Sequence, residues 1–129
     1  MFDPDGFDVW LNELAKRNIL DKVFILVGIT PLKTLKMATY MHHEVPGVTI
    51  PESILKRMEK AGEGTGAEEE GVQIALELIE KIRYKQGVHG IHIMAVGWEA
   101  IVPRIVKEAG LMRVAPGDPP PNDVKAVPA

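Results

Sequence analysis

The sequence predicts an α/β protein in which parallel strands are joined by crossover helices. Two short runs of β-forming apolar residues, over 23–27 and 91–96, alternate with segments whose apolar residues recur at helical spacing. This alternation is typical of parallel sheets. Because two parallel strands cannot enclose a core and a complete (β/α)8 barrel needs about 250 residues, we expect the 129 residues to form the last βα units of a partial (β/α)8 barrel.

The first half of the chain is expected to hold two helices and one strand. The first helix is predicted around 7–14 and is expected to end at Asn18. Its apolar residues share one face: Phe7, Trp10, Leu11 and Leu14. The run 23–27 is continuously apolar, which predicts a strand buried on both faces and closed by Gly28 and Pro31. A second helix is predicted over 32–43.

The second half is expected to hold three helices and one strand. Thr49 and Glu52 have capping-box spacing, which predicts a short helix beginning there. The glycine-rich segment 62–66 is predicted to be a flexible break. The longest helix is predicted over 67–85, with Gly87 as its stop. A strand over 91–96 and a last helix that ends at Gly110 complete the order.

Composition and charge exclude several classes of function. Asp and Glu total 18 against 15 Lys and Arg, so the net charge of −3 gives no basic excess for nucleic acid. The chain has no cysteine, which excludes thiol catalysis, disulfides and thiolate metal sites. Its longest apolar run, 23–29, is too short to span a membrane. The acidic amino-terminal segment lacks a signal-peptide pattern, so we expect a cytoplasmic protein.

Proline is concentrated at the end of the chain. Five of the ten prolines fall in the last 14 residues, where a helix or a central strand cannot form around them. We therefore expect one folded domain over 1–113 and an extended, disordered tail over 114–129. A proline-rich ligand for an aromatic groove is the alternative, and a plain tail is favoured.

Five short motifs occur in a specific order. They are FD at 2–3, FILVGITP at 24–31, VTIP at 48–51, GVQIA at 71–75 and GVHGIH at 87–92. Each is weak alone, but the ordered set resembles the C-terminal third to half of methylenetetrahydrofolate reductases. The resemblance covers residues 2–113.

The resemblance implies a flavin-dependent (β/α)8 barrel that reduces 5,10-methylenetetrahydrofolate to 5-methyltetrahydrofolate. Hydride would pass from NADH, NADPH or another reductant through FAD. By this match, 23–28 would be the seventh strand, 91–95 the eighth and 1–3 the stub of the sixth. The family's catalytic acidic residue and most FAD contacts would lie upstream of residue 1. We therefore assign no catalytic residue and expect the isolated chain to be inactive.

Four residues are candidates for the substrate-binding face. Thr30 follows a predicted strand, at the barrel end that carries the chemistry; its hydroxyl would either meet the flavin or pterin or cap the next helix. By resemblance, Met37 stands where the family has a glutamine, Met41 where it has an aromatic residue and Trp98 where it has an arginine. The polar contacts that the family would make with folate or nicotinamide are thus changed or lost. Packing is the alternative for both methionines, and a core position is the alternative for Trp98.

Two other patterns are weaker. The histidines at 42, 43, 89 and 92, with Glu44, do not converge, because neighbours on a helix or strand point in different directions; surface histidines are favoured over a metal site. The glycines at 62, 64 and 66 resemble a phosphate loop, but no strand precedes them and Glu63 and 68–70 surround them with negative charge. A linker is favoured.

Three functions follow as alternatives. The first is the C-terminal part of a reductase of one-carbon metabolism. The second is a non-catalytic half-barrel module that completes another chain, because apolar strands with unpaired edges need a partner. The third is a small homodimeric α/β protein. The first predicts no flavin binding by the chain alone and an upstream reading frame with the missing strands, the second an obligate dimer or hetero-complex, and the third a stable dimer without folate or flavin affinity.

Overall fold

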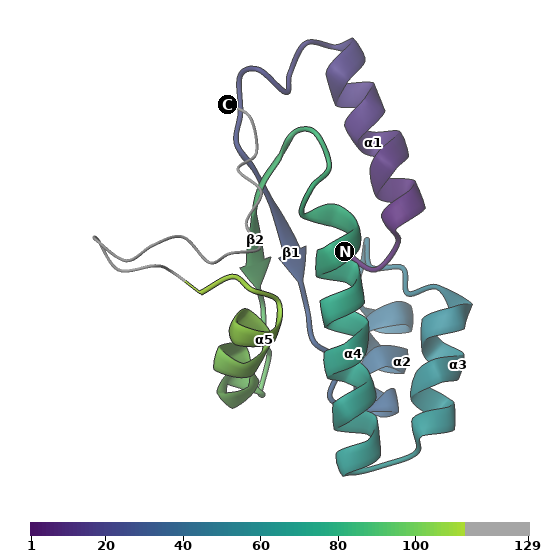
Figure 1. The fold of residues 1–129 in the computed structure, drawn as a ribbon. Helices are drawn as coiled ribbons and strands as arrows, with labels where there is room; N and C mark the ends of the chain where they lie inside the picture. Colours follow the sequence, from purple (N-terminus) through teal and green to yellow (C-terminus); the bar gives the residue numbers. More distant parts are fainter. Residues whose placement is uncertain (113–129) are drawn as a thin grey trace.

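The computed structural model describes residues 1–112 and contains five α-helices and two strands (Figure 1). The elements in order are α1 (Pro4–Lys16), β1 (Ile25–Ile29), α2 (Leu35–Glu44), α3 (Glu52–Ala61), α4 (Thr65–Ile82), β2 (Val88–Ile93) and α5 (Val102–Glu108), with a short 3-10 helix over Glu99–Ile101. The predicted tail over 114–129 lies outside the described residues. Within residues 1–112, no helix is both long and apolar enough to cross a lipid bilayer.

The two strands form a parallel sheet, as the sequence predicts. Val27 pairs with Ile91 and Ile29 with Ile93, and α2, α3 and α4 make the crossover between the strands. This mixed α/β arrangement is compatible with part of an α/β barrel. Both strands are displaced from their predicted limits, because β1 begins two residues later and β2 begins three residues earlier. Strand limits follow the pairing partner, which the apolar pattern of one strand does not contain.

Only one face of the described sheet is covered, so the prediction of a strand buried on both faces is wrong. Ile25, Val27 and Ile29 are buried, whereas Leu26 between them is 64% exposed. Phe24, which was expected inside the strand, is 85% exposed and lies before it. Its ring meets His89 edge-on, 4.9 Å between centroids. The continuous apolar run therefore supplies one buried face and one open face.

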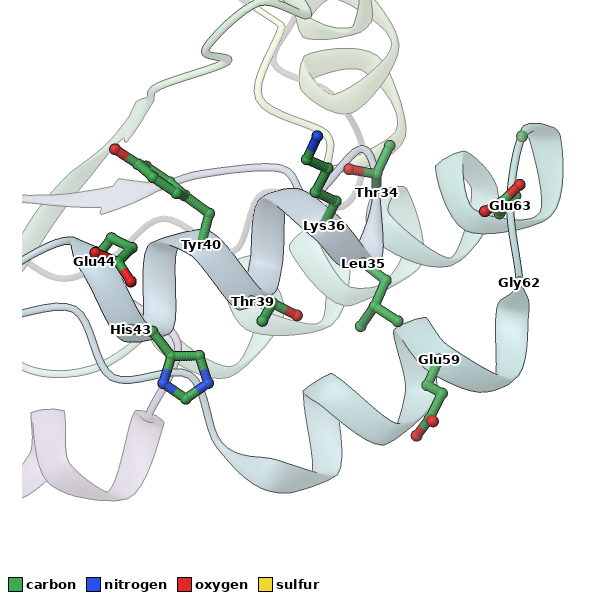
Figure 2. A pocket seen from close by; sticks show the side chains of 11 residues that line it. Thr34, Leu35, Lys36, Thr39, Tyr40, His43, Glu44, Glu59, Gly62 and Glu63 are labelled. Carbon is green, nitrogen blue, oxygen red and sulfur yellow. The ribbon is translucent and has the colours of Figure 1, made fainter.

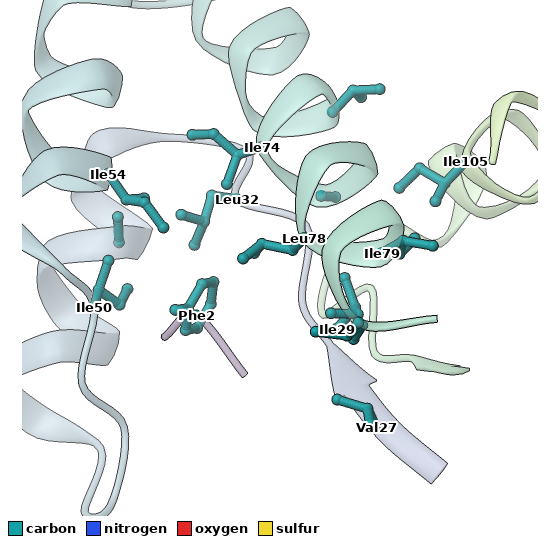
Figure 3. Packing of buried hydrophobic residues seen from close by; sticks show 14 of the residues in the cluster. Phe2, Val27, Ile29, Leu32, Ile50, Ile54, Ile74, Leu78, Ile79 and Ile105 are labelled. Atoms are coloured by element: carbon teal, nitrogen blue, oxygen red, sulfur yellow. The ribbon is translucent and has the colours of Figure 1, made fainter. Parts of the chain in front are cut away.

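Helix α4 covers the buried face of the sheet and organises the core (Figure 3). Eight of its residues are buried, including Val72, Ile79 and Ile82. Gly71 lets the helix approach the backbone of Leu32, because a Cβ at this position would overlap the Leu32 carbonyl oxygen. The buried side chains of α4 then pack against β1, α3 and α5.

The amino-terminal segment lies along the other edge of β1. The amino group of Met1 donates a hydrogen bond to the Gly28 carbonyl oxygen over 2.7 Å, and Phe2 is buried in the core. Burial lowers the pKa of the Met1 amino group. Asp3 caps α1 by accepting from the backbone N–H groups of Asp5 and Gly6. The segment thus occupies the place expected for a neighbouring strand, next to β1 and opposite β2.

Helix ends differ from several predictions because capping geometry decides them. The second helix begins at Leu35, since the Thr34 hydroxyl accepts from the Met37 N–H over 3.0 Å. The predicted Thr49–Glu52 capping box is wrong: α3 begins after Pro51, without a side-chain cap. Helix α4 begins at Thr65, inside the predicted glycine break, and ends at Ile82 rather than near Gly87. Trp10, predicted for the buried face of the first helix, is 49% exposed.

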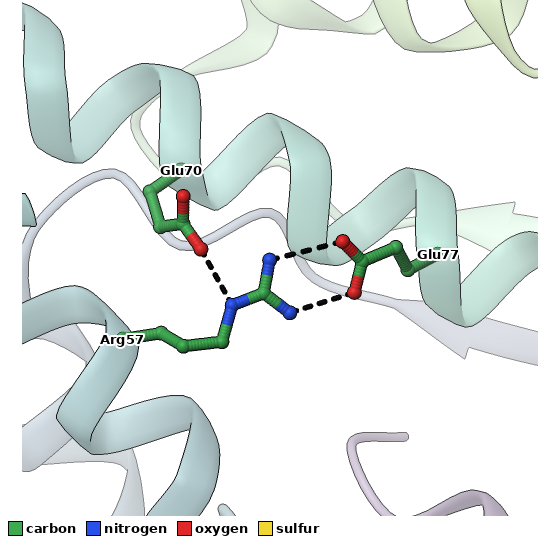
Figure 4. Close-up of polar contacts among 3 residues, drawn as sticks. All are labelled: Arg57, Glu70 and Glu77. Atoms are coloured by element: carbon green, nitrogen blue, oxygen red, sulfur yellow. Dashed lines mark hydrogen bonds and ion pairs between the residues drawn. The ribbon is translucent and has the colours of Figure 1, made fainter.

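Ion pairs join the outer helices to α4. Arg57 on α3 donates to Glu70 and, through two guanidinium nitrogens at 2.6 and 3.0 Å, to Glu77 (Figure 4). The two carboxylates raise the pKa of Arg57, and Arg57 lowers the pKa of Glu77. On the other side of α4, Arg104 forms an ion pair with Glu69. The hydrogen bond from Arg104 lowers the pKa of the Glu69 carboxyl group. These bonds fix α3 and α5 against the central helix.

We predict that Gly71→Ala destabilises the protein strongly. The new methyl group must displace either α4 or the chain at Leu32, and overpacking of this kind costs about 2–3 kcal/mol of unfolding free energy. Urea unfolding followed by circular dichroism measures the change. The matched control is Gln73→Ala on the exposed side of the same helix; equal effects of the two substitutions would contradict the backbone contact.

We predict that Arg57→Ala lowers the unfolding free energy by only about 1 kcal/mol at neutral pH, because the ion pairs of Arg57 are partly exposed and screened by solvent.

The pKa of Glu77 is lowered in the folded state. Its contribution to the unfolding free energy is therefore complete above the ordinary carboxyl pKa and disappears as the pH falls through the lowered value. Glu77→Gln should therefore flatten the acid side of the stability profile. Lys56→Ala, which removes an exposed pair with Glu52, should change stability by less than half as much.

Candidate functional site

A hollow of about 470 Å³ opens at the carboxyl ends of the two strands. Its walls come from the amino-terminal segment, the residue after β1, helix α2 with the turn that follows it, and the chain after β2. The side chains are mostly apolar and include Phe2, Phe7, Thr30, Met41, Val48, Met94 and Val96. Its volume lies within the range of about 300–1,000 Å³ that is typical of small-molecule sites. We call this hollow the strand-end pocket.

Thr30 supplies the polar side chain at the base of the strand-end pocket. It follows the last residue of β1, is 6% exposed and is the one buried polar residue among residues 1–112. Its hydroxyl makes no hydrogen bond with another described residue, yet it is not sealed from the pocket. Thr34 caps α2, so the helix-cap alternative for Thr30 is wrong. A hydroxyl that reaches the pocket and has no partner among residues 1–112 is free to bond a ligand.

Two methionines from different elements face the same pocket. Met41 reaches it from α2, and Met94 follows β2 at its carboxyl end. The side chain of Met94 lies over Gly28, where a Cβ would come within 2.7 Å of its terminal methyl group. The glycine in β1 therefore makes room for Met94 beside Thr30. Flexible, polarisable thioethers suit contact with the face of a planar ring.

The other two predicted residues lie outside the lining of the strand-end pocket. Met37 is partly buried on α2, four residues before Met41. Trp98 is partly buried against the core, and the Lys33 ammonium lies 6.0 Å from the centre of its ring. Lys33 is also 3.8 Å from a Glu68 carboxylate oxygen. The structure thus brings Thr30 and Met41 together in one pocket, whereas Met37 and Trp98 do not line it.

Sequence reasoning missed Met94, Val96 and the turn over Val45–Val48. Because the second strand was predicted to continue through residue 96, Met94 and Val96 were placed inside it. The strand ends at Ile93, so both residues belong to the loop that follows the sheet. The pairing of β2 with β1, in which Ile29 is opposite Ile93, determines where β2 ends. The apolar pattern of a single strand does not contain this information.

A larger groove of about 1060 Å³ runs between α2 and α3 (Figure 2). Leu35, Tyr40 and His43 line it from α2, and Glu59 and Glu63 line it from the end of α3 and the following loop. It lies on the helical side of the chain, away from the strand ends. None of the four predicted site residues lines it, so we place the candidate site in the smaller strand-end pocket.

The histidines do not form a metal centre. His42 and His89 each accept a backbone N–H at Nδ1, from Ile50 over 3.1 Å and from Ile25 over 3.2 Å. His92 is exposed on β2. Within residues 1–112, no three acidic or histidine side chains converge closely enough to hold a metal ion.

We predict that Thr30→Val leaves stability unchanged or slightly raised, within about 0.5 kcal/mol. Within residues 1–112 no side-chain hydrogen bond of Thr30 would be lost, and valine has nearly the same shape. Thermal unfolding of the two proteins at one pH tests this. A loss above about 1 kcal/mol would show that the hydroxyl has a structural partner, which would remove the reason to assign it to a ligand.

The chain was compared with known proteins. The family model for methylenetetrahydrofolate reductase matches residues 1–110. No curated protein and no solved structure matches the chain. The matched residues include α1 to α5, both strands and every residue that lines the strand-end pocket. The chain belongs to the methylenetetrahydrofolate reductase family.

Proposed function

We propose that this chain forms the C-terminal part of the substrate cleft of a methylenetetrahydrofolate reductase. The reaction would convert 5,10-methylenetetrahydrofolate to 5-methyltetrahydrofolate in the cytoplasm, with NADH, NADPH or another reductant as the electron source. The observation that carries the proposal is Thr30, a buried polar residue that lines the base of a mostly apolar pocket at the carboxyl ends of the strands, in a chain of this family. The carboxyl ends of the strands are where α/β barrels carry their chemistry.

The pocket chemistry fits a flat heterocyclic ring. Thr30 provides one hydroxyl that both donates and accepts, while Met41 and Met94 provide apolar contact. No lysine or arginine lines the pocket, so these residues fit a pterin or flavin ring better than the pyrophosphate of FAD. In this proposal most FAD contacts would lie on other strands.

Each residue has a defined part in this proposal. A flavin, when bound, supplies hydride transfer. Thr30 would orient a ring by bonding one of its polar edge atoms, and Met41 and Met94 would keep water from its face. Met37 and Trp98 replace the polar residues that the family resemblance implies. Because Trp98 does not line the pocket, the ring would be held mainly by van der Waals contact and by the Thr30 hydroxyl.

A second candidate function is favoured by the open face of the sheet. Leu26 and Phe24 are exposed there, and Val96 beyond β2 is 70% exposed. Parallel sheets are almost always covered on both faces. A non-catalytic module that completes another chain, or a homodimer, would cover these residues. This alternative predicts a stable complex with no flavin or folate affinity.

We predict that the purified 129-residue chain elutes from size exclusion as an oligomer. Absorbance near ~450 nm that co-elutes with the protein would show a flavin site assembled from several copies. A colourless oligomer that also fails to bind folate would contradict the reductase proposal and favour the alternative. A colourless sample that still binds folate would place the flavin contacts outside this chain.

We predict that Thr30→Val weakens binding of 5-formyltetrahydrofolate, used as a stable folate probe, roughly tenfold. Loss of one buried hydrogen bond to the ligand accounts for a change of this size. Isothermal titration calorimetry measures it. Thr39→Val on the exposed face of α2 is the matched control, because Thr39 lines the other groove. Equal affinities of wild type and Thr30→Val would overturn the role of this hydroxyl.

A further inference from the structure

One wall of the strand-end pocket is a tight turn between α2 and α3. The Val48 N–H donates to the Val45 carbonyl oxygen over 3.2 Å, and Gly47 has a φ of +80°. Proline at the second position and glycine with positive φ at the third are typical of a type II turn. Val45, Gly47, Val48 and Thr49 line the pocket. We call residues 45–49 the pocket wall.

The two ends of the pocket wall are held differently. Its first end continues directly from α2. Its second end is held by Ile50, which is 1% exposed and whose N–H donates to the Nδ1 atom of His42 over 3.1 Å. Within residues 1–112, no other hydrogen bond joins this end of the wall to α2. The accepting Nδ1 atom carries no proton, so neutral His42 holds its proton on Nε2.

We propose that His42 is a pH-dependent latch for the pocket wall. In its neutral form His42 accepts the Ile50 N–H and fixes the wall against α2; protonation of His42 releases the wall and loosens the strand-end pocket. The effect of the latch on ligand binding rests on the proposed function, whereas the latch itself depends only on the contact between His42 and Ile50.

The chemistry of imidazole gives the direction. A protonated histidine carries hydrogens on both nitrogens, so Nδ1 becomes a donor that faces another donor, the Ile50 N–H. Histidine is the side chain whose ordinary protonation change falls between pH 5 and 8. The wall is therefore held by neutral His42 and released when His42 takes up a proton. By linkage, a ligand that needs the closed wall favours neutral His42 and binds more weakly at the lower pH.

Few charges compete for His42. Its ring meets that of His43 edge-on, 4.8 Å between centroids. The charged residues of α2 and α3 include Glu44, Glu52 and Lys56, and Asp3 precedes α1. Asp3 is occupied as the cap of α1, and Lys56 pairs with Glu52 over 2.7 Å. Within residues 1–112, no carboxylate forms an ion pair with His42, so the Ile50 N–H is its main polar partner.

Amide hydrogen exchange by NMR tests the latch on the ligand-free, full-length chain. His42 is titrated through its ring proton signals, and the exchange of the Ile50 amide, corrected for the intrinsic pH dependence, is followed over the same range. We expect protection of Ile50 to fall at least tenfold as His42 becomes protonated. Protection that stays constant through the His42 titration, or that follows His43 instead, would overturn the proposal.

Two variants separate the latch from general destabilisation. Asparagine places its Oδ1 atom near the position of histidine Nδ1 but does not titrate, so His42→Asn should keep Ile50 protected at both pH values. His42→Ala should leave Ile50 unprotected at both. His43→Asn is the control and should retain the wild-type profile. A pH-dependent loss of protection in His42→Asn equal to that of wild type would contradict the latch.

A binding measurement separates this inference from the proposed function. The affinity for 5-formyltetrahydrofolate is measured for wild type and for His42→Asn at two pH values. These are a value at which wild-type His42 is neutral and one at which it is protonated. The probe's own ionisation cancels in this comparison, and we expect a loss of five-fold or more at low pH in wild type only. Binding that is equal at both pH values would overturn the link between wall and ligand. Absence of binding in both proteins would overturn the proposed function, and the exchange result would still decide the latch.

Discussion

The close approach of α4 to the chain at Leu32 is the contact on which the rest of the structure depends. Gly71 permits it, because any side chain would occupy the place of the Leu32 carbonyl group. With the helix this close, Val72, Ile79 and Ile82 reach the buried face of β1 and the interior against α5. The same contact fixes the segment 30–34, which sets the position of Thr30 and the beginning of α2. A backbone contact two residues along the chain from Thr30 therefore helps to determine the base of the strand-end pocket.

The core is built from one side of the sheet only. Alternate residues of β1 point toward α4, and the residues between them face the open side. The helices cover only one face of the sheet. The strand-end pocket lies between the amino-terminal segment and the loops that follow the two strands. The five helices leave part of the apolar surface of the two strands uncovered, which is why Leu26 is exposed. The proposed oligomer would cover this surface.

The arginine ion pairs lie away from the strand-end pocket. The Arg57 and Arg104 pairs lie on the outer surfaces of α3, α4 and α5, where they orient helices. The strand-end pocket has no such pair, and its one buried hydroxyl stands among thioethers and aliphatic side chains. This arrangement suits a family whose proposed ligand is a flat ring. The amide of the buried Ile50 needs an acceptor, and the Nδ1 atom of His42 provides one without an ion pair.

The sequence by itself determined the element order, the parallel sheet, the family and two of the pocket residues, Thr30 and Met41. These follow from local patterns, since helical periodicity, apolar runs and ordered motifs lie within short stretches of chain. Only the tertiary structure decided the strand limits, the one-sided burial of β1, the place of Met94 and the bond between His42 and Ile50. The physical reason is that each depends on a partner distant in sequence: Val88 fixes where β1 begins, α4 decides which face is buried, and Gly28 makes room for Met94. Such contacts leave no periodic signal in either segment alone.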